Sequence, residues 1–218
     1  ILPHGGPADG GTEVRLEGLG LAVGRGQLMR CEFGGRVVNA RLAQSIESSH
    51  VTSAQLRCRT PIVAVAGPVA VRVSLDGGDT WVPGATTYTY YDSPDVRALR
   101  PPSGPIAGGT LALVLGAGFG PYPSLGPAVA VCRFGSRASS PPRGGNDGMA
   151  LQPSGWSVGD APLRTHMARF VTTPATILHD GAMRCRAPDA HGLAEAAVEV
   201  SLNGRDFSSS RTPTHFQY

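Results

Sequence analysis

Four cysteines are the residues with the most distinctive chemistry in this 218-residue chain. They are Cys31, Cys58, Cys132 and Cys185, and four cysteines can form disulfides in three different pairings. A zinc site would need closely spaced ligands such as Cys-x-x-Cys, a pattern that is absent here. Two interpretations stay open at this point: disulfides in an oxidising compartment, or buried free thiols in a cytosolic protein.

Two glycine-rich segments could suggest a phosphate-binding loop. They are Gly116–Gly120 (GAGFG) and the shorter Gly18–Gly20 (GLG). Binding of a dinucleotide would require a helix directly after the loop, with its N-terminus against the pyrophosphate. Sequence rich in glycine and proline follows instead, so we interpret both segments as structural turns and predict no cofactor.

The histidines form no pattern that predicts a metal or an acid–base site. His166, His179 and His191 lie near Asp180 and Asp189 in the sequence, but no pair has helical or zinc-like spacing. The sequence also contains no Gly-x-Ser-x-Gly nucleophile motif and no phosphate loop. We therefore predict that the chain is not an enzyme and binds neither a metal nor a small-molecule substrate.

One aromatic residue is a candidate for contact with a partner protein. Trp156, with Met149 and Leu151 nearby, could anchor a partner because aromatic side chains dominate interface hot spots. The alternative is that Trp156 folds back onto its own domain, since large exposed aromatic side chains are disfavoured.

The elements that position these residues are revealed by an internal repeat. A set of landmarks occurs twice, in the same order. The matching segments are Ile1–Thr12 with Leu99–Thr110, Cys31–Gly34 with Cys132–Gly135, Leu56–Pro61 with Met183–Pro188, Val71–Gly77 with Val198–Gly204, and Tyr88–Tyr90 with Phe216–Tyr218. This predicts two copies of one fold. Each copy carries its own cysteine pair, so the repeat favours Cys31 with Cys58 and Cys132 with Cys185.

Short apolar runs separated by 30 glycines and 19 prolines predict an all-β protein with many tight turns. Val14–Gly18 and Leu111–Gly116 have the composition of strands. Asp76-Gly77 and Asn203-Gly204 predict hairpin turns, because both residues of each pair can adopt a positive φ. The aromatic-x-aromatic ends of the two copies are expected to bury large rings.

Together, these landmarks resemble the IPT/TIG domain, an immunoglobulin-like module found in plexins, related receptors and some transcription factors. The resemblance is carried by the P-x-x-G-P-x-x-GGT opening, the G-x-G strand end, the C-x-F-G and C-x-[TA]-P elements and the aromatic end, and it covers nearly the whole chain. It implies two tandem β-sandwiches, at residues 1–92 and 93–218. The second copy departs from the first by a Gly/Pro/Ser-rich surface insertion at about 136–179.

Composition argues against several other classes. The net charge is only +3 and all nineteen basic residues are scattered arginines, whereas a DNA-binding module usually clusters its basic residues. A carbohydrate-binding module would need a row of exposed aromatic residues, and only 6% of the residues are aromatic. No apolar run is long enough to span a bilayer, so we predict no membrane contact by this segment.

The sequence therefore predicts a non-catalytic spacer that binds other proteins, either further copies of itself or different chains. We expect it to be a segment of a larger cell-surface or secreted adhesion or recognition protein. The short connection Tyr91–Asp95, which contains a proline, predicts a restricted angle between the two copies. An intracellular structural role in a ciliary or cytoskeletal assembly is the alternative, and the absence of an Asn-x-Ser/Thr sequon is compatible with it.

Overall fold

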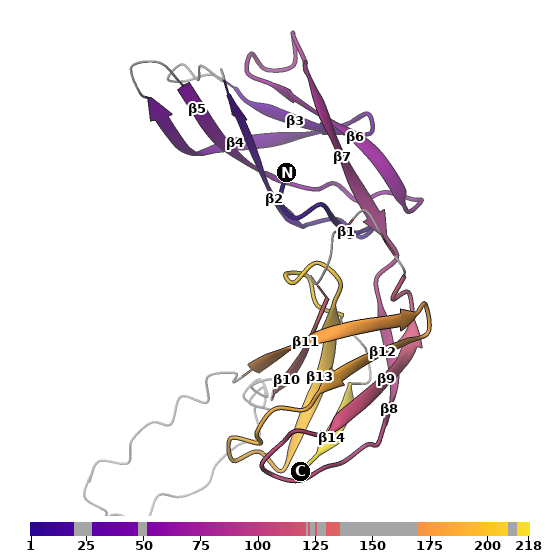
Figure 1. Ribbon diagram of the computed structural model, residues 1–218. Helices are drawn as coiled ribbons and strands as arrows, with labels where there is room; N and C mark the ends of the chain where they lie inside the picture. The colour runs from indigo at the N-terminus through magenta and orange to yellow at the C-terminus, as the bar shows by residue number, and fades with distance from the viewer. Residues whose placement is uncertain are drawn as a thin grey trace, which may run out of the picture.

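Strands make up the regular structure of the part of the chain that the computed structural model describes. That part comprises residues 1–19, 28–47, 52–120, 122, 125, 130–135, 170–208 and 213–218. The strands form two seven-stranded sheets, one from each half of the chain, and each sheet folds into a sandwich. Figure 1 shows the two sandwiches end to end. The prediction of an all-β chain with two immunoglobulin-like sandwiches is confirmed.

The first sandwich contains strands β1 to β7. Their bounds are β1 Gly5–Pro7, β2 Glu13–Leu19, β3 Arg30–Phe33, β4 Arg36–Glu47, β5 Thr52–Arg59, β6 Gly67–Ser74 and β7 Val82–Tyr91. The strand order is β1-β7-β6-β3-β4-β5-β2. The β1–β7 pair is parallel and the other pairs in this sandwich are antiparallel.

The second sandwich contains strands β8 to β14. Their bounds are β8 Asp95–Arg100, β9 Leu111–Ala117, β10 Val131–Gly135, β11 Phe170–His179, β12 Ala182–Arg186, β13 Glu195–Ser201 and β14 Thr214–Gln217. The strand order is β14-β13-β10-β11-β12-β9-β8. Position by position this repeats the order β7-β6-β3-β4-β5-β2 of the first sandwich.

The strands at the sheet edges also correspond, although each sandwich has a full strand where the other has a single bridge. β1 pairs with β7 over three residues, and its counterpart in the second sandwich is the parallel bridge between Ser103 and Gln217. β8 pairs with β9, and its counterpart in the first sandwich is the bridge between Leu2 and Arg15. The two sandwiches therefore have one common topology.

One strand in each sandwich belongs to both layers. The first part of β4 pairs with β3 and its later part pairs with β5. β11 behaves in the same way between β10 and β12. The layers face each other across the core, and this strand joins them covalently.

Alternation of apolar and polar residues explains which side chains fill each core. On β2, Val14 and Leu16 are buried, while Glu17, the next residue along the strand, is exposed. At the aromatic ends, Tyr88, Tyr90 and Phe216 are fully inaccessible as predicted, whereas Tyr218 is only partly buried. Phe33 meets the Tyr88 ring edge to face at 5.5 Å, a favoured aromatic geometry.

The Gly-Gly-Thr turns show how closely the two copies agree. Gly10 and Gly108 have φ angles of 71° and 72°, a region that residues with a Cβ rarely adopt. A Cβ on Gly10 would lie 2.6 Å from the carbonyl carbon of Pro61, and one on Gly108 would lie 2.4 Å from that of Pro188. Both glycines are therefore required by the same close approach of two backbone segments.

The hairpins at the two predicted turns form, but their turns are longer than two residues. β6 and β7 are antiparallel neighbours, and so are β13 and β14. Gly77 and Gly204 have positive φ angles, whereas Asp76 and Asn203 do not. Only the glycine of each pair uses the positive φ that both residues could adopt, because the two polar side chains instead hydrogen-bond within longer turns.

Part of the predicted insertion is regular structure. Residues 170–179 form β11, which pairs with β10 and β12, so these ten residues belong to the second sheet and not to a surface connection. Ala175 and Ile177 on this strand pack against the core at alternate positions. Residues 136–169, the rest of the predicted insertion, lie outside the described residues.

Candidate functional site between the two sandwiches

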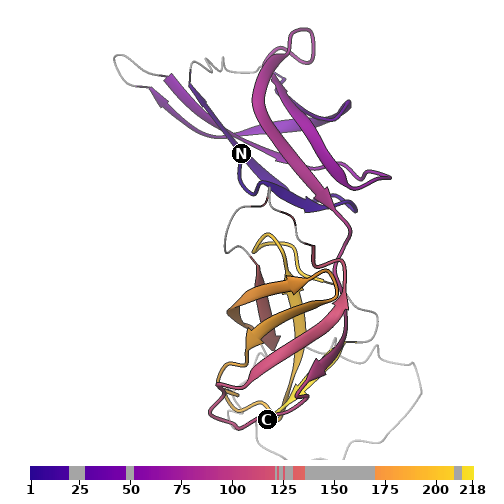
Figure 2. The ribbon, with the colours of Figure 1, turned by 45° about the vertical axis from the view of Figure 1, so that its right-hand side comes forward.

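The contact between the sandwiches is the part of the structure that bears most directly on a spacer. It is built around the turn that follows β13, residues Leu202–Ser208, which we call the junction turn. In Figures 1 and 2 the upper end of the second sandwich faces the end of the first sandwich where β1 lies. Residues of the junction turn hydrogen-bond to the first sandwich there.

Asn203 organises the junction turn. Its side-chain oxygen accepts hydrogen bonds from the Ser201 hydroxyl at 3.1 Å and from the backbone N–H groups of Arg205 and Asp206 at 3.0 and 2.9 Å. An asparagine that closes a turn with its own side chain is a common device in loops. Because the oxygen is used inside the turn, the amide nitrogen is free to donate outward.

Three hydrogen bonds connect this turn to the first sandwich. The Asn203 amide donates to the carbonyl oxygen of Gly5 at 3.0 Å. The Thr12 hydroxyl donates to the Asp206 carboxylate at 2.7 Å, and the Arg205 guanidinium donates to the carbonyl oxygen of Glu13 at 3.3 Å. Asn203 also donates to Asp206 at 2.7 Å, which holds the carboxylate toward Thr12.

The hydrogen bonds of Thr12 and Asn203 are buried, so they constrain the orientation of the two sandwiches. Thr12 is fully buried and Asn203 is 4% exposed, so breaking their hydrogen bonds would leave polar groups without water to replace the partner. A Cβ added to Gly5 would lie 2.3 Å from Cδ2 of Leu125 in the second sandwich and 2.4 Å from the Thr89 carbonyl oxygen. The end of the first sandwich that carries Gly5 and Thr12, which we call its base, therefore fits closely against the second sandwich.

The segment that connects the two sandwiches is also fixed, through Tyr91 and Ser93. Tyr91, the last residue of β7, is 1% exposed and packs in the core of the second sandwich, with its ring 5.5 Å from that of Tyr122. Burial raises the pKa of the Tyr91 phenol far above its ordinary value, and the negative charge of Asp206 adds to this shift. The Ser93 hydroxyl donates to the Asp9 carboxylate at 2.5 Å. The connecting segment is thus fixed on both sides.

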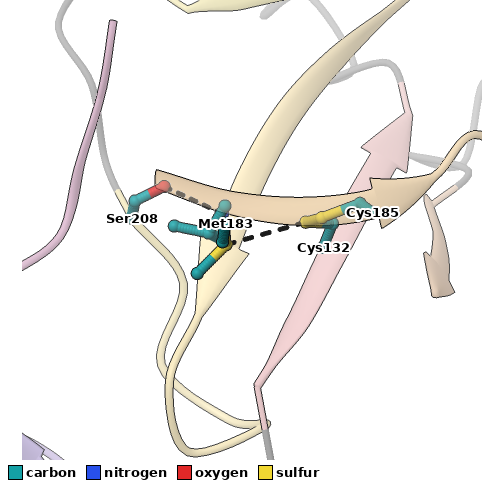
Figure 3. Close-up of a disulfide and its surroundings, with 5 residues drawn as sticks. Cys132, Met183, Cys185 and Ser208 are labelled. Atoms are coloured by element: carbon teal, nitrogen blue, oxygen red, sulfur yellow. Dashed lines mark hydrogen bonds between the residues drawn. A yellow bond between two sulfur atoms is a disulfide. The ribbon is translucent and has the colours of Figure 1, made fainter. Parts of the chain in front are cut away.

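Each sandwich has one disulfide between its two layers. Cys31 on β3 is bonded to Cys58 on β5, and Cys132 on β10 to Cys185 on β12, with Cα–Cα distances of 6.4 and 6.2 Å. All four are buried in the cores. Figure 3 shows the second bridge, where the Met183 sulfur lies 3.9 Å from Sγ of Cys132. These are the pairings that the repeat favours.

An ion pair with a buried carboxylate occupies the same place in both sheets with its charges exchanged. On β3, Glu32 accepts a hydrogen bond from Arg72 of β6. At the matching positions, β10 carries Arg133 and β13 carries Glu199, and the Arg133 Nε donates to that carboxylate at 2.8 Å. The Arg133 guanidinium also lies 3.8 Å from the centre of the Phe207 ring. Each sheet thus keeps its cross-strand pair, whichever strand supplies the cation.

The histidines and aspartates singled out in the sequence that fall in the described part of the chain form no metal cluster. Among the residues that the structure describes, no group of three or more His, Cys, Asp or Glu could hold a metal. His191 lies 3.9 Å from Asp189 and both are exposed. His166 and the candidate partner contacts Trp156, Met149 and Leu151 lie outside the described residues.

The sequence did not single out the residues that join the two sandwiches. Asn203 was interpreted as part of a hairpin and Thr12 as the start of a strand, and both statements hold locally. The signal available was the exchange of Asp76 in the first copy for Asn203 in the second, which supplies an amide donor. That exchange does not reveal which backbone carbonyl, 198 residues away, accepts the bond.

Comparison with known proteins agrees with this architecture. The family model of the IPT/TIG domain matches residues 1–90. These residues are an IPT/TIG domain. The match ends at the last strand of the first sandwich, and the second sandwich repeats the strand order of this IPT/TIG domain. No curated protein matches the chain.

Among solved structures, the chain is similar to the full extracellular region of plexin A4, domains 1 to 10. The TM-score is 0.53 with 16% identity, over 99% of this chain and 15% of the plexin chain. A second structure of that region, with domains 1 to 8, gives a TM-score of 0.45 with 16% identity, over 99% of this chain and 17% of that one. At this identity the likeness concerns the fold. The described residues include no helix of the length and apolar character that crossing a membrane requires.

Proposed function

We propose that this chain is a non-catalytic spacer and protein-interaction segment in the extracellular part of a larger cell-surface or secreted protein, acting in adhesion or recognition. The second sandwich is a second IPT/TIG domain, and the two domains cover residues 1–92 and 93–218. The partners are other proteins, and the segment itself contacts neither nucleic acid nor a membrane and takes no small-molecule substrate.

The observation that carries the proposal is the buried contact at the junction turn. A spacer must hold its modules at a defined angle, and modules within one chain move relative to each other unless a specific interface prevents it. Asn203 and Arg205 each donate a hydrogen bond to the first sandwich, Asp206 accepts one from Thr12, and Tyr91 is anchored in the second core. This arrangement supports a semi-rigid pair.

The extracellular location is supported by the paired cysteines and by the resemblance of the fold to a plexin extracellular region. Disulfides persist in oxidising compartments and are rare in the cytosol. Labelling of thiols in the natural protein, with and without prior reduction, tests this. We expect no reactive thiol before reduction and four after it. Four reactive thiols in the unreduced, unfolded protein would favour the intracellular ciliary or cytoskeletal role.

Residual dipolar couplings test the spacer function, because they report the relative orientation of the two sandwiches in solution. We expect one alignment tensor to fit both sandwiches of the unaltered chain. The double variant N203A/D206A should require two tensors of different magnitude, while the control D189A, which removes an exposed aspartate elsewhere, should behave like the unaltered chain. Two different tensors in the unaltered chain would contradict the spacer function.

A further inference from the structure

The first sandwich has a counterpart of the junction turn at its opposite end. This distal turn comprises residues Leu75–Trp81 between β6 and β7, and it follows Ser74 as the junction turn follows Ser201. Figures 1 and 2 place the β6–β7 connection at the end of the first sandwich that points away from the second. Asp79 is the fifth residue after its serine, which is also the position of Asp206 in the junction turn.

The two turns share the hydrogen bond from the serine to the Asx side chain and differ in the backbone groups that close them, which are Thr80 in the distal turn and Arg205 and Asp206 in the junction turn. The Ser74 hydroxyl donates to the Asp76 carboxylate at 2.7 Å, as the Ser201 hydroxyl donates to Asn203 at 3.1 Å. The backbone N–H of Thr80 donates to Asp76 at 2.9 Å and closes the distal turn. Gly77 and Gly204, at matching positions, both have a positive φ. Asp79 therefore matches Asp206 by its position after the shared serine and glycine.

The surface around the distal turn carries the same two kinds of contact group as the junction. Asp79 is exposed, and Leu28 is 71% exposed and lies beside the turn, with its Cβ 3.8 Å from a Cβ built on Gly77. At the junction, the Asp206 carboxylate accepts from a threonine hydroxyl, and Leu125 packs on a glycine. A carboxylate and a leucine thus both contact the first sandwich at the junction, and a carboxylate and a leucine are both exposed at the free end.

We propose that the distal turn and Leu28 dock on the base of another β-sandwich of this kind. The base that fits has a threonine in the position of Thr12, to donate to Asp79, and a glycine in the position of Gly5, on which Leu28 packs. At the internal junction, a base with this threonine and this glycine contacts the junction turn. The inference goes beyond the proposed spacer function, which depends only on the internal junction.

The chain carries one further base, on its second sandwich, and this base supplies a probe. Thr110 stands in the position of Thr12, and Ser103, which is exposed, stands in that of Gly5. A Cβ at the matching Gly5 would meet Leu125, so we expect the serine side chain to obstruct a docking leucine. The variant S103G therefore presents a base that matches the one occupied at the junction, whereas the additional change T110V removes its hydroxyl donor.

The test is a titration of the isotope-labelled full chain with unlabelled S103G chain up to about 1 mM, monitored by amide NMR signals. We expect saturable shifts at Gly77, Asp79 and Thr80 of the labelled chain. The labelled variant D79A should bind at least tenfold more weakly, since a hydrogen bond to a charged group is lost. The labelled control E17Q, which also removes one exposed negative charge but in the middle of β2, should bind as the unaltered chain does.

Two results would overturn the inference. One is the absence of saturable shifts at the distal turn over the whole titration. The other is equal binding by D79A and E17Q, which would mean that the carboxylate takes no part, or equal binding by the S103G and S103G/T110V titrants, which would mean that the hydroxyl takes no part. Neither result affects the dipolar-coupling test of the internal junction, so failure of this docking and failure of the spacer function are distinguishable.

Discussion

The exchanged ion pair of the two sheets allows a quantitative test of how the cores tolerate charge. Glu199 is only 4% exposed, and the Arg133 guanidinium covers it while contacting the Phe170 and Phe207 rings at 4.3 and 3.8 Å. Removing one partner of a buried pair costs about 3–5 kcal/mol, because the remaining charge stays buried. R133A should therefore destabilise the second sandwich by about 4 kcal/mol.

The first sandwich supplies the matched comparison. The Arg72 side chain is 46% exposed, against 24% for Arg133, so water reaches Glu32 more easily than Glu199 when the arginine is removed. R72A should therefore cost less than half as much as R133A, since water screens the pair that a half-exposed arginine forms with Glu32.

The reversal of both charges is the decisive variant. R133E places two carboxylates opposite each other and should be the least stable variant of the series. R133E/E199R recreates the arrangement of Glu32 and Arg72 and should recover about 2 kcal/mol of that loss, within the range of coupling between contacting residues. The gain should be incomplete because the arginine leaves the position from which it contacts Phe207.

Hydrogen exchange followed by mass spectrometry is the suitable assay, because peptides from β10 and β13 report the opening of the second sandwich separately from the first. The disulfides are kept intact throughout. If R133E/E199R exchanges as fast as R133E, the two positions are not coupled, and the interpretation of the exchanged pair as one interchangeable unit is refuted.

Three further predictions use other features. G10A should destabilise the first sandwich much more than G11A when compared by thermal unfolding: both residues have a positive φ, but only at Gly10 would a Cβ meet backbone, 2.6 Å from Pro61. Burial raises the pKa of Tyr90 to about 12, so stability that is complete below pH 10 should be lost as the pH rises toward 12, which absorbance at 295 nm and circular dichroism can follow together. Equal stability at pH 9 and pH 12 would contradict that linkage. Reduction of both disulfides should lower the unfolding free energy of each sandwich by about 4 kcal/mol in denaturant titrations; no change in the transition midpoints would contradict it.

The architecture was largely predictable from the sequence because the two copies constrain each other. Val14 and Leu16 alternate with polar residues, the Gly-Gly-Thr turns recur, and each copy has its own cysteine pair. The charge exchange was also visible, since Glu32 aligns with Arg133. The sequence does not show, however, which strand pairs with which, and so it does not show that each residue faces an opposite charge.

The junction was not predictable, for a physical reason. Asn203, Thr12 and Gly5 are typical residues of turns and strand starts, and each satisfies a local requirement that explains its type. Their contact across 198 and 194 positions depends on the angle between two finished sandwiches. The long turn at Asp76 was missed because the Ser74 hydroxyl and the Thr80 backbone and hydroxyl donate to the aspartate and replace the tight turn that the Asp-Gly pair alone favours.

Tyr91 belongs by hydrogen bonding to one sandwich and by packing to the other. It pairs with β1 as the end of β7, and its ring helps to fill the second core beside Val96. A cut of the polypeptide after residue 92 would therefore take a core side chain away from the C-terminal half, and a protein fragment meant to fold alone should begin at Tyr91. The core of the second sandwich is therefore completed by the last residue of β7, which belongs to the first sandwich.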